Sequence, residues 1–137
     1  MINNQTPGNN NQISRDNSQP PNRHAFDLEQ RTTEFAKGVV RLCKALPRNP
    51  INDRLTGQAV GSAGSVGANY REANDALGKK DFIHRLKISR KEAKEVMHWF
   101  ELIIEANPDF QAQTRPLISE AKELKNILSS IISKFDQ

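Results

Sequence analysis

The sequence has few of the features on which disulfide-bonded, secreted and membrane proteins depend. Its 137 residues include one cysteine, Cys43, which has no partner for an internal disulfide and on a helix is typical of a small buried side chain. No span of about 20 apolar residues is present, and no apolar run follows Met1 as a signal peptide would require. We therefore expect a cytoplasmic protein that does not enter a membrane.

Motifs of catalytic and metal sites are also absent. The sequence contains no H-E-x-x-H, G-x-S-x-G or paired-cysteine motif, and no Lys followed by Ser or Thr closes a phosphate-binding glycine loop. Glu95 and His98 have the E-x-x-H spacing of di-iron helix bundles, but those sites need two such pairs and two further inward-facing glutamates. Only one pair is present, and its histidine points away from the apolar stripe described below. We predict no enzyme activity, no metal site and no cofactor.

The length fits one domain with one hydrophobic core. Residues 1–24 are crowded with Asn, Gln, Ser and Pro and contain almost nothing apolar, so they cannot offset the entropy lost on ordering the chain. We predict a disordered tail over residues 1–24 and one folded domain over residues 25–137.

Apolar residues recur at alternating spacings of three and four in three segments, a pattern that predicts amphipathic helices. The motif "PRNP" ends the first segment and Asn107-Pro108 ends the next. The predicted buried stripes are Leu28, Thr32, Phe35, Val39, Leu42 and Leu46; Phe82, Leu86, Ser89, Ala93, Val96, Phe100 and Ile103; and Leu117, Ala121, Leu124, Leu128, Ile131 and Phe135.

The glycine-rich stretch "GQAVGSAGSVGANYREAN", residues 57–74, occupies the slot between the first two segments. The same spacing continues through it in Leu55, Ala59, Ser62, Val66, Asn69, Ala73 and Ala76, which favours a helix over a loop. The opposite face then carries only small residues, namely Gly57, Gly61, Gly64 and Ala68. Each glycine costs about 1 kcal/mol relative to alanine in a helix, a cost that close packing can offset. We predict contact with a neighbouring subunit at this face, and a small exposed face is the alternative.

A second apolar strip lies beside the predicted core of the helix that follows. It consists of Ile88, Trp99 and Leu102, and we call it the Trp99 strip. Aromatic side chains at such flanks are common interface anchors. With the small-residue face, this strip predicts a homo-oligomer.

The blocks "SVGANYREAN", residues 65–74, and "DFIHRLKISRKEAKEVMHWFELI", residues 81–103, resemble a family of four-helix-bundle proteins first noticed as reading frames within intervening sequences of bacterial 23S ribosomal RNA genes. The similarity runs from about Phe26 to Phe135, and "VMHW" at 96–99 departs from it, because relatives tend to have Thr and Tyr there. The resemblance implies an all-α, antiparallel up-down-up-down four-helix bundle that assembles into a ring, often a pentamer. One branch of the family serves diversity-generating retroelements as an accessory protein whose basic barrel binds nucleic acid and a reverse transcriptase.

One row of basic residues gives the clearest functional signal from the residues themselves. On the side opposite Phe82 and Phe100, a single helix aligns Lys80, His84, Lys87, Lys91, Lys94 and His98, which we call the basic ridge. Such a ridge could follow a phosphate backbone. Glutamates on the same helix, such as Glu95 four residues after Lys91, favour an ordinary solvated face instead. Two hypotheses remain: an oligomeric scaffold that binds RNA or DNA, with a partner such as a reverse transcriptase, or an oligomeric adaptor that binds only protein.

Polar residues in the "ANYRE" block have two interpretations. Arg71 could meet an anionic partner. Alternatively, and in our preferred interpretation, Asn69 on the apolar stripe fixes the register of the helices, and Glu72 pairs with Arg85 or another basic residue of the adjacent helix.

Overall fold

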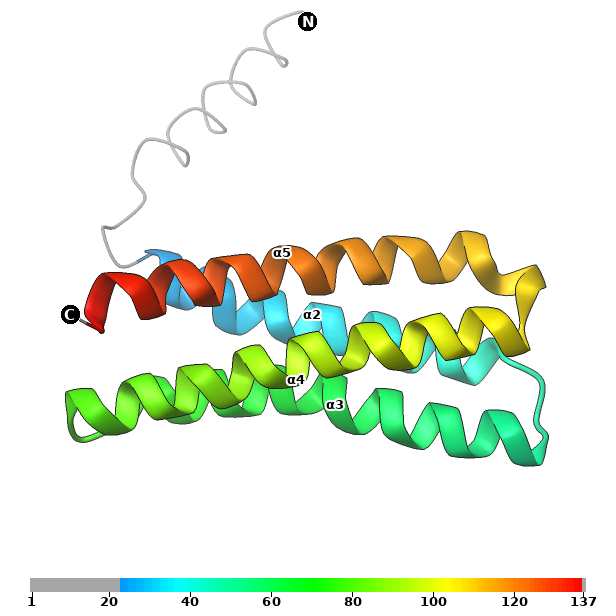
Figure 1. Ribbon diagram of the computed structural model, residues 1–137, viewed down its shortest axis with the longest axis horizontal. Coiled ribbons are helices and arrows are strands. Elements are labelled where there is room, and N and C mark those ends of the chain that lie inside the picture. The colour runs from blue at the N-terminus through cyan, green and yellow to red at the C-terminus, as the bar shows by residue number, and fades with distance from the viewer. Residues whose placement is uncertain (1–22, 137) are drawn as a thin grey trace, which may run out of the picture.

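The computed structural model describes residues 23–136, with side chains from Leu28 onward. Its long helices are α2 (Arg23–Ala45), α3 (Pro50–Asn74), α4 (Lys79–Ala106) and α5 (Gln111–Phe135), and a 3-10 turn, η2 (Pro108–Phe110), precedes α5. Successive helices run in opposite directions and are joined by short turns (Figure 1). The predicted up-down-up-down four-helix bundle is therefore confirmed. Residues 1–22 of the predicted tail lie outside the described residues, and α2 already begins at Arg23.

Each helix packs against two neighbours in the order α2, α3, α4, α5. Packing is most extensive between α3 and α4 and least extensive between α2 and α5. The seam between α3 and α4 therefore lies on the opposite side of the bundle from the seam between α2 and α5.

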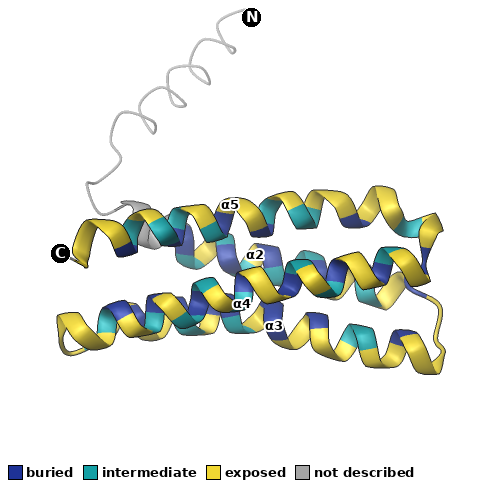
Figure 2. Cartoon of the chain, viewed as in Figure 1, coloured by how far each residue is buried: buried dark blue, intermediate teal, exposed yellow. Residues whose placement is uncertain are grey.

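The core follows the predicted stripes along most of the bundle (Figure 2). All six residues of the first predicted stripe are buried, and in α4 only Phe82 of the predicted seven is not fully buried. In α5 the stripe prediction fails near the C-terminal end, where Ile132 is buried, Ile131 is half-buried and Phe135 is 43% exposed. A straight α-helix drifts about 20° per heptad from a strict seven-residue repeat, so the buried position shifts by one residue along the helix.

Two buried asparagines join the turns at one end of the bundle. The side-chain amide of Asn52 donates to Oδ1 of Asn107 at 2.8 Å, and that of Asn107 donates to Oδ1 of Asn52 at 2.9 Å. Each amide also donates to a backbone carbonyl, that of Pro47 at 2.8 Å for Asn52 and that of Ile103 at 3.0 Å for Asn107. The pair therefore ties the α2–α3 turn to the end of α4. The sequence pattern marked Asn107 only as the end of a helix and gave no sign of its pairing with Asn52.

The α2–α5 seam is closed at one end and open at the other. Arg31 of α2 donates from Nε to Glu120 Oε2 at 2.7 Å and from Nη2 to Glu123 Oε1 at 2.9 Å, both on α5. The hydrogen bond to Glu120 raises the pKa of the Arg31 guanidinium above its ordinary value. Farther toward Ala45, Leu117 of α5 lies against Gly38 of α2, and a groove opens between the side chains of the two helices.

Cys43 is half-buried against the core, and burial raises the pKa of its thiol to about 11. Because the thiolate is the reactive form, we expect iodoacetamide at pH 8 to alkylate the native protein about 100-fold more slowly than a peptide thiol. The thiol of the unfolded chain has the lower pKa and is deprotonated at a lower pH than the folded one. The part of the free energy of unfolding that Cys43 contributes is therefore complete below about pH 9 and is lost as the pH rises to about 11. Alkylation as fast in the native state as in urea would contradict the burial.

Candidate functional site

The basic ridge lies on the solvent-facing side of α4. Lys80, His84, Lys87, Lys91, Lys94 and His98 are all exposed, as the spacing predicted. Lys87 pairs with Asp136, just after α5, with 3.3 Å between Nζ and Oδ2. The other ridge lysines have no ion pair within the described part of the chain, although many other basic residues there are paired with carboxylates of their own chain.

The glutamate expected to neutralise Lys91 is bound elsewhere. Glu95 Oε2 accepts hydrogen bonds from Ser62 Oγ of α3 and from Trp99 Nε1, each at 3.1 Å. The predicted alternative of an ordinary Lys91–Glu95 pair is therefore wrong, because the carboxylate turns toward α3. The rings of His98 and Trp99 form a T-shaped pair, with centroids 4.9 Å apart. Among residues 28–136 no group of three or more His, Cys, Asp or Glu side chains could hold a metal ion.

The small-residue face of α3 is open. Gly57, Gly61, Gly64 and Ala68 are exposed, and a Cβ added at any of the three glycines would meet nothing within 4 Å. No described helix of the same chain therefore explains these glycines. Gly67, which sequence analysis did not include in this face, is the closely packed one, because its Cβ would lie 2.8 Å from Thr32 Oγ1 of α2.

The predicted apolar strip lies on the α3 side of α4, where Trp99 is bound to Glu95 and Glu95 to Ser62 of α3. Ile88 and Trp99 are half-buried, and Leu102 is 38% exposed. The indole N–H of Trp99 is already bound to Glu95, so the ring presents mainly apolar surface there.

The polar residues of the "ANYRE" block act within the chain. Asn69 is half-buried, and its amide donates to the Ser65 carbonyl of its own helix at 2.9 Å, so it makes no register-fixing contact between the described helices. Arg85 Nε lies 3.7 Å from Asp81 Oδ1 of its own helix, and Glu72 is exposed with no ion pair in the described chain. The predicted pairing of Glu72 with Arg85 or another basic residue of the adjacent helix is therefore wrong.

Arg71 pairs with a carboxylate on a neighbouring helix of the same chain. Its Nη1 donates to Glu29 Oε1 at 3.0 Å and its Nη2 donates to Thr33 Oγ1 at 3.1 Å, both on α2. This contact ties α3 to α2 and leaves the guanidinium engaged.

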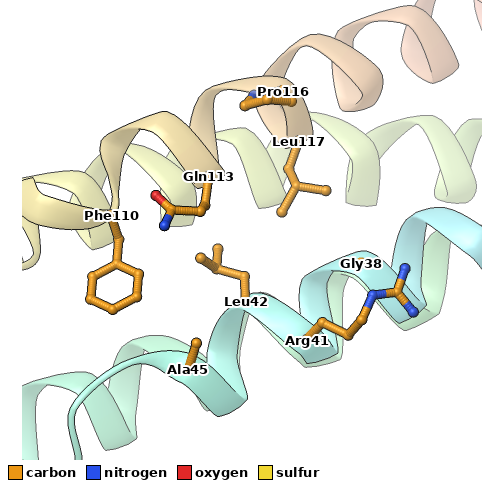
Figure 3. Close-up of a pocket in the computed structure, with 8 residues that line it drawn as sticks. All are labelled: Gly38, Arg41, Leu42, Ala45, Phe110, Gln113, Pro116 and Leu117. Atoms are coloured by element: carbon orange, nitrogen blue, oxygen red, sulfur yellow. The ribbon is translucent and has the colours of Figure 1, made fainter.

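A groove that sequence analysis missed, which we call the Leu42 groove, lies in the open end of the α2–α5 seam (Figure 3). It has a volume of about 300 Å³, and its lining is mainly apolar, with Arg41 as the charged residue. The lining residues are Gly38, Arg41, Leu42, Ala45, Phe110, Gln113, Pro116 and Leu117. Pro116 inside α5 and Gly38 inside α2 were the available sequence signals. The groove and the Trp99 strip lie on opposite seams of the bundle.

Comparison with known proteins assigns the chain to a family. None of the helices within residues 23–136 has the length and apolar character that a membrane span requires. No curated protein matches the sequence. A crystal structure of a protein of unknown function from the S23 ribosomal protein family of Bacteroides thetaiotaomicron matches with 34% identity and a TM-score of 0.67, covering 77% of this chain and 97% of that one. The sequence pattern of the family described as 23S rRNA-intervening sequence protein matches residues 25–130, and the chain therefore belongs to that family.

Proposed function

We propose that this protein is a non-catalytic, cytoplasmic homo-oligomer that binds RNA or DNA through the basic ridge of α4. The observation that carries the proposal is that the ridge lysines other than Lys87 are exposed and have no ion pair in the described chain, while Glu95 of the same helix binds elsewhere. Such side chains are free to meet phosphates, and phosphate contacts supply most sequence-independent binding to nucleic acid. A reverse transcriptase is the protein partner to test first, by analogy with the retroelement branch of the family.

Assembly would strengthen a weak patch. The small-residue face with the Trp99 strip lies on one side of the bundle and the Leu42 groove on the other, so a contact between the two surfaces joins different faces of successive copies. Contacts of that kind close into rings when the rotation permits, and a pentamer is the ring expected from the family. Repetition of the ridge around a ring would raise the effective concentration of phosphate-binding groups.

A protein-only adaptor is the second candidate. The exposed small-residue face and the apolar groove favour it, because both suit helix packing and neither suits phosphate. Nucleic-acid binding by the purified protein, measured over a salt series, separates the two candidates.

We expect replacement of Lys87, Lys91 and Lys94 by Gln to weaken binding to nucleic acid and to lower its salt dependence. Removal of one phosphate contact reduces the slope of log affinity against log salt by about 0.7 to 0.9, so removal of three changes it by about 2 to 3 per chain. Fluorescence anisotropy with labelled RNA and DNA measures both quantities, and circular dichroism checks that the exposed substitutions leave the fold intact.

The matched control removes three exposed cations elsewhere, at Lys44, Arg54 and Lys134, none of which lines the groove or has an ion pair in the described chain. Both variants lose the same net charge. If the α4 variant binds with the parent's affinity and slope, the ridge is a solvated face and the adaptor is the better interpretation.

A further inference from the structure

We infer that the nucleic-acid site extends beyond α4 to the seam between α4 and α5, where it holds the backbone of a duplex. This inference rests on the proposed function and adds Arg90, Lys122 and Lys125 to the ridge. Together with Lys91 and Lys94, they form the seam cluster. None of the five has an ion pair in the described chain.

The register of the two helices brings these cations together. Arg90 Nη1 of α4 donates to Ser129 Oγ of α5 at 3.3 Å. Because α4 and α5 are antiparallel, the residues about one turn farther along the seam, Lys94 of α4 and Lys125 of α5, lie at the same level of the two helices. Lys122 lies about one further turn along α5. Two rows of like charge therefore run side by side.

Three carboxylates close in sequence to the cluster are bound to other parts of the chain. Glu95 of α4 is bound to Ser62 of α3. Glu120 and Glu123 of α5 are bound to Arg31 of α2. Clustered like charges destabilise a fold unless a counter-charge is present. Because these five cations gather along one seam and none of them has an ion pair in the described chain, the counter-charge expected here is an external anion.

Ion pairs mark the two ends of the cluster. At one end Lys87 Nζ lies 3.3 Å from Asp136 Oδ2. At the other end Arg115 Nη1 lies 3.7 Å from Glu101 Oε2. At 1.5 Å per residue the interval between Lys87 and Glu101 is about 21 Å long, which equals about six base-pair steps of 3.4 Å. Five cations over this length match the density of phosphates that one face of a duplex presents.

The chemistry of the cluster favours a duplex over a single strand. Proteins that hold single strands stack bases on aromatic side chains. The five residues include no aromatic side chain, and the nearby Trp99 lies on the α3 side of α4 with its N–H bound to Glu95. The cluster can thus contact phosphates but offers no stacking surface, so binding should be independent of sequence and tightest for double strands.

The test is anisotropy of the full-length protein with a 20-base-pair duplex and with its separated strands, over a salt series. We expect Lys122→Gln/Lys125→Gln to lower the slope of log affinity against log salt by about 1.8, and to weaken duplex binding by tenfold or more at about 0.1 M salt. Lys44→Gln/Arg54→Gln, which removes the same charge from other faces, should leave the slope unchanged. Lys122→Glu changes only an exposed position and should weaken binding even if the double variant folds poorly.

The outcomes separate this inference from the proposed function. Equal losses of affinity in the two double variants, or single strands binding as tightly as the duplex, would overturn the seam assignment. If the Lys87/Lys91/Lys94 variant loses affinity while the α5 variant does not, nucleic-acid binding stands and the extension to α5 falls. A parent protein that binds no nucleic acid at low salt would remove the proposed function and the seam site together.

Discussion

Asn52→Ala is expected to destabilise the bundle by about 3 kcal/mol, which corresponds to a roughly 100-fold rise in the unfolding equilibrium constant. The substitution leaves the buried Oδ1 of Asn107 without its donor and one of that residue's amide hydrogens without its acceptor. It also frees the Pro47 carbonyl and leaves a small void. Urea unfolding followed by circular dichroism measures the change, and Asn126→Ala, at an exposed site of α5, should stay within about 0.5 kcal/mol of the parent.

The partner substitution shows whether the two amides act as a pair. Asn52→Ala/Asn107→Ala should cost clearly less than the sum of the single changes, because each single change leaves an unsatisfied group that the other removes. Strict additivity would contradict the reciprocal hydrogen bonds.

The sequence predicted the helices well because apolar spacing determines which face a helix buries. The stripe through Ala59 and Val66 identified α3 as a helix although its glycines allowed a loop. Near the end of α5 the prediction failed although the heptad spacing continued. Ile132 replaces Ile131 in the core because a straight α-helix drifts from a strict seven-residue repeat. The drift adds up along the helix, so it shows only near the end of a long one.

Interactions between helices were harder to predict. Asn69 lay on the apolar stripe, yet the buried contact between asparagines joins Asn52 and Asn107, which meet only because two turns lie at the same end of the bundle. The basic ridge was visible from the sequence of one helix. The proposed continuation of this ridge to Lys122 and Lys125 depends on the register of α4 against α5, which one sequence does not specify.

The small-residue face of α3 gives the test of assembly. Gly61→Leu/Gly64→Leu is expected to convert the proposed oligomer into folded monomers, because overpacking in a close helix contact costs about 1 to 3 kcal/mol per site. Within the chain both positions are open, so the fold itself should tolerate the leucines. Light scattering after size-exclusion chromatography measures the mass, and thermal unfolding reports on the fold.

Alanine substitutions separate the two environments of the glycines of α3. In the monomer, Gly64→Ala should stabilise the fold by about 0.5 to 1 kcal/mol, because its Cβ meets nothing and the unfolded chain loses freedom. Gly67→Ala should instead destabilise the monomer, since its Cβ would lie 2.8 Å from Thr32 Oγ1. If the parent is a monomer, or if the double leucine variant keeps the parent's mass, the glycine face is plain solvent-exposed surface, and a ring would have to use the Leu42 groove without it.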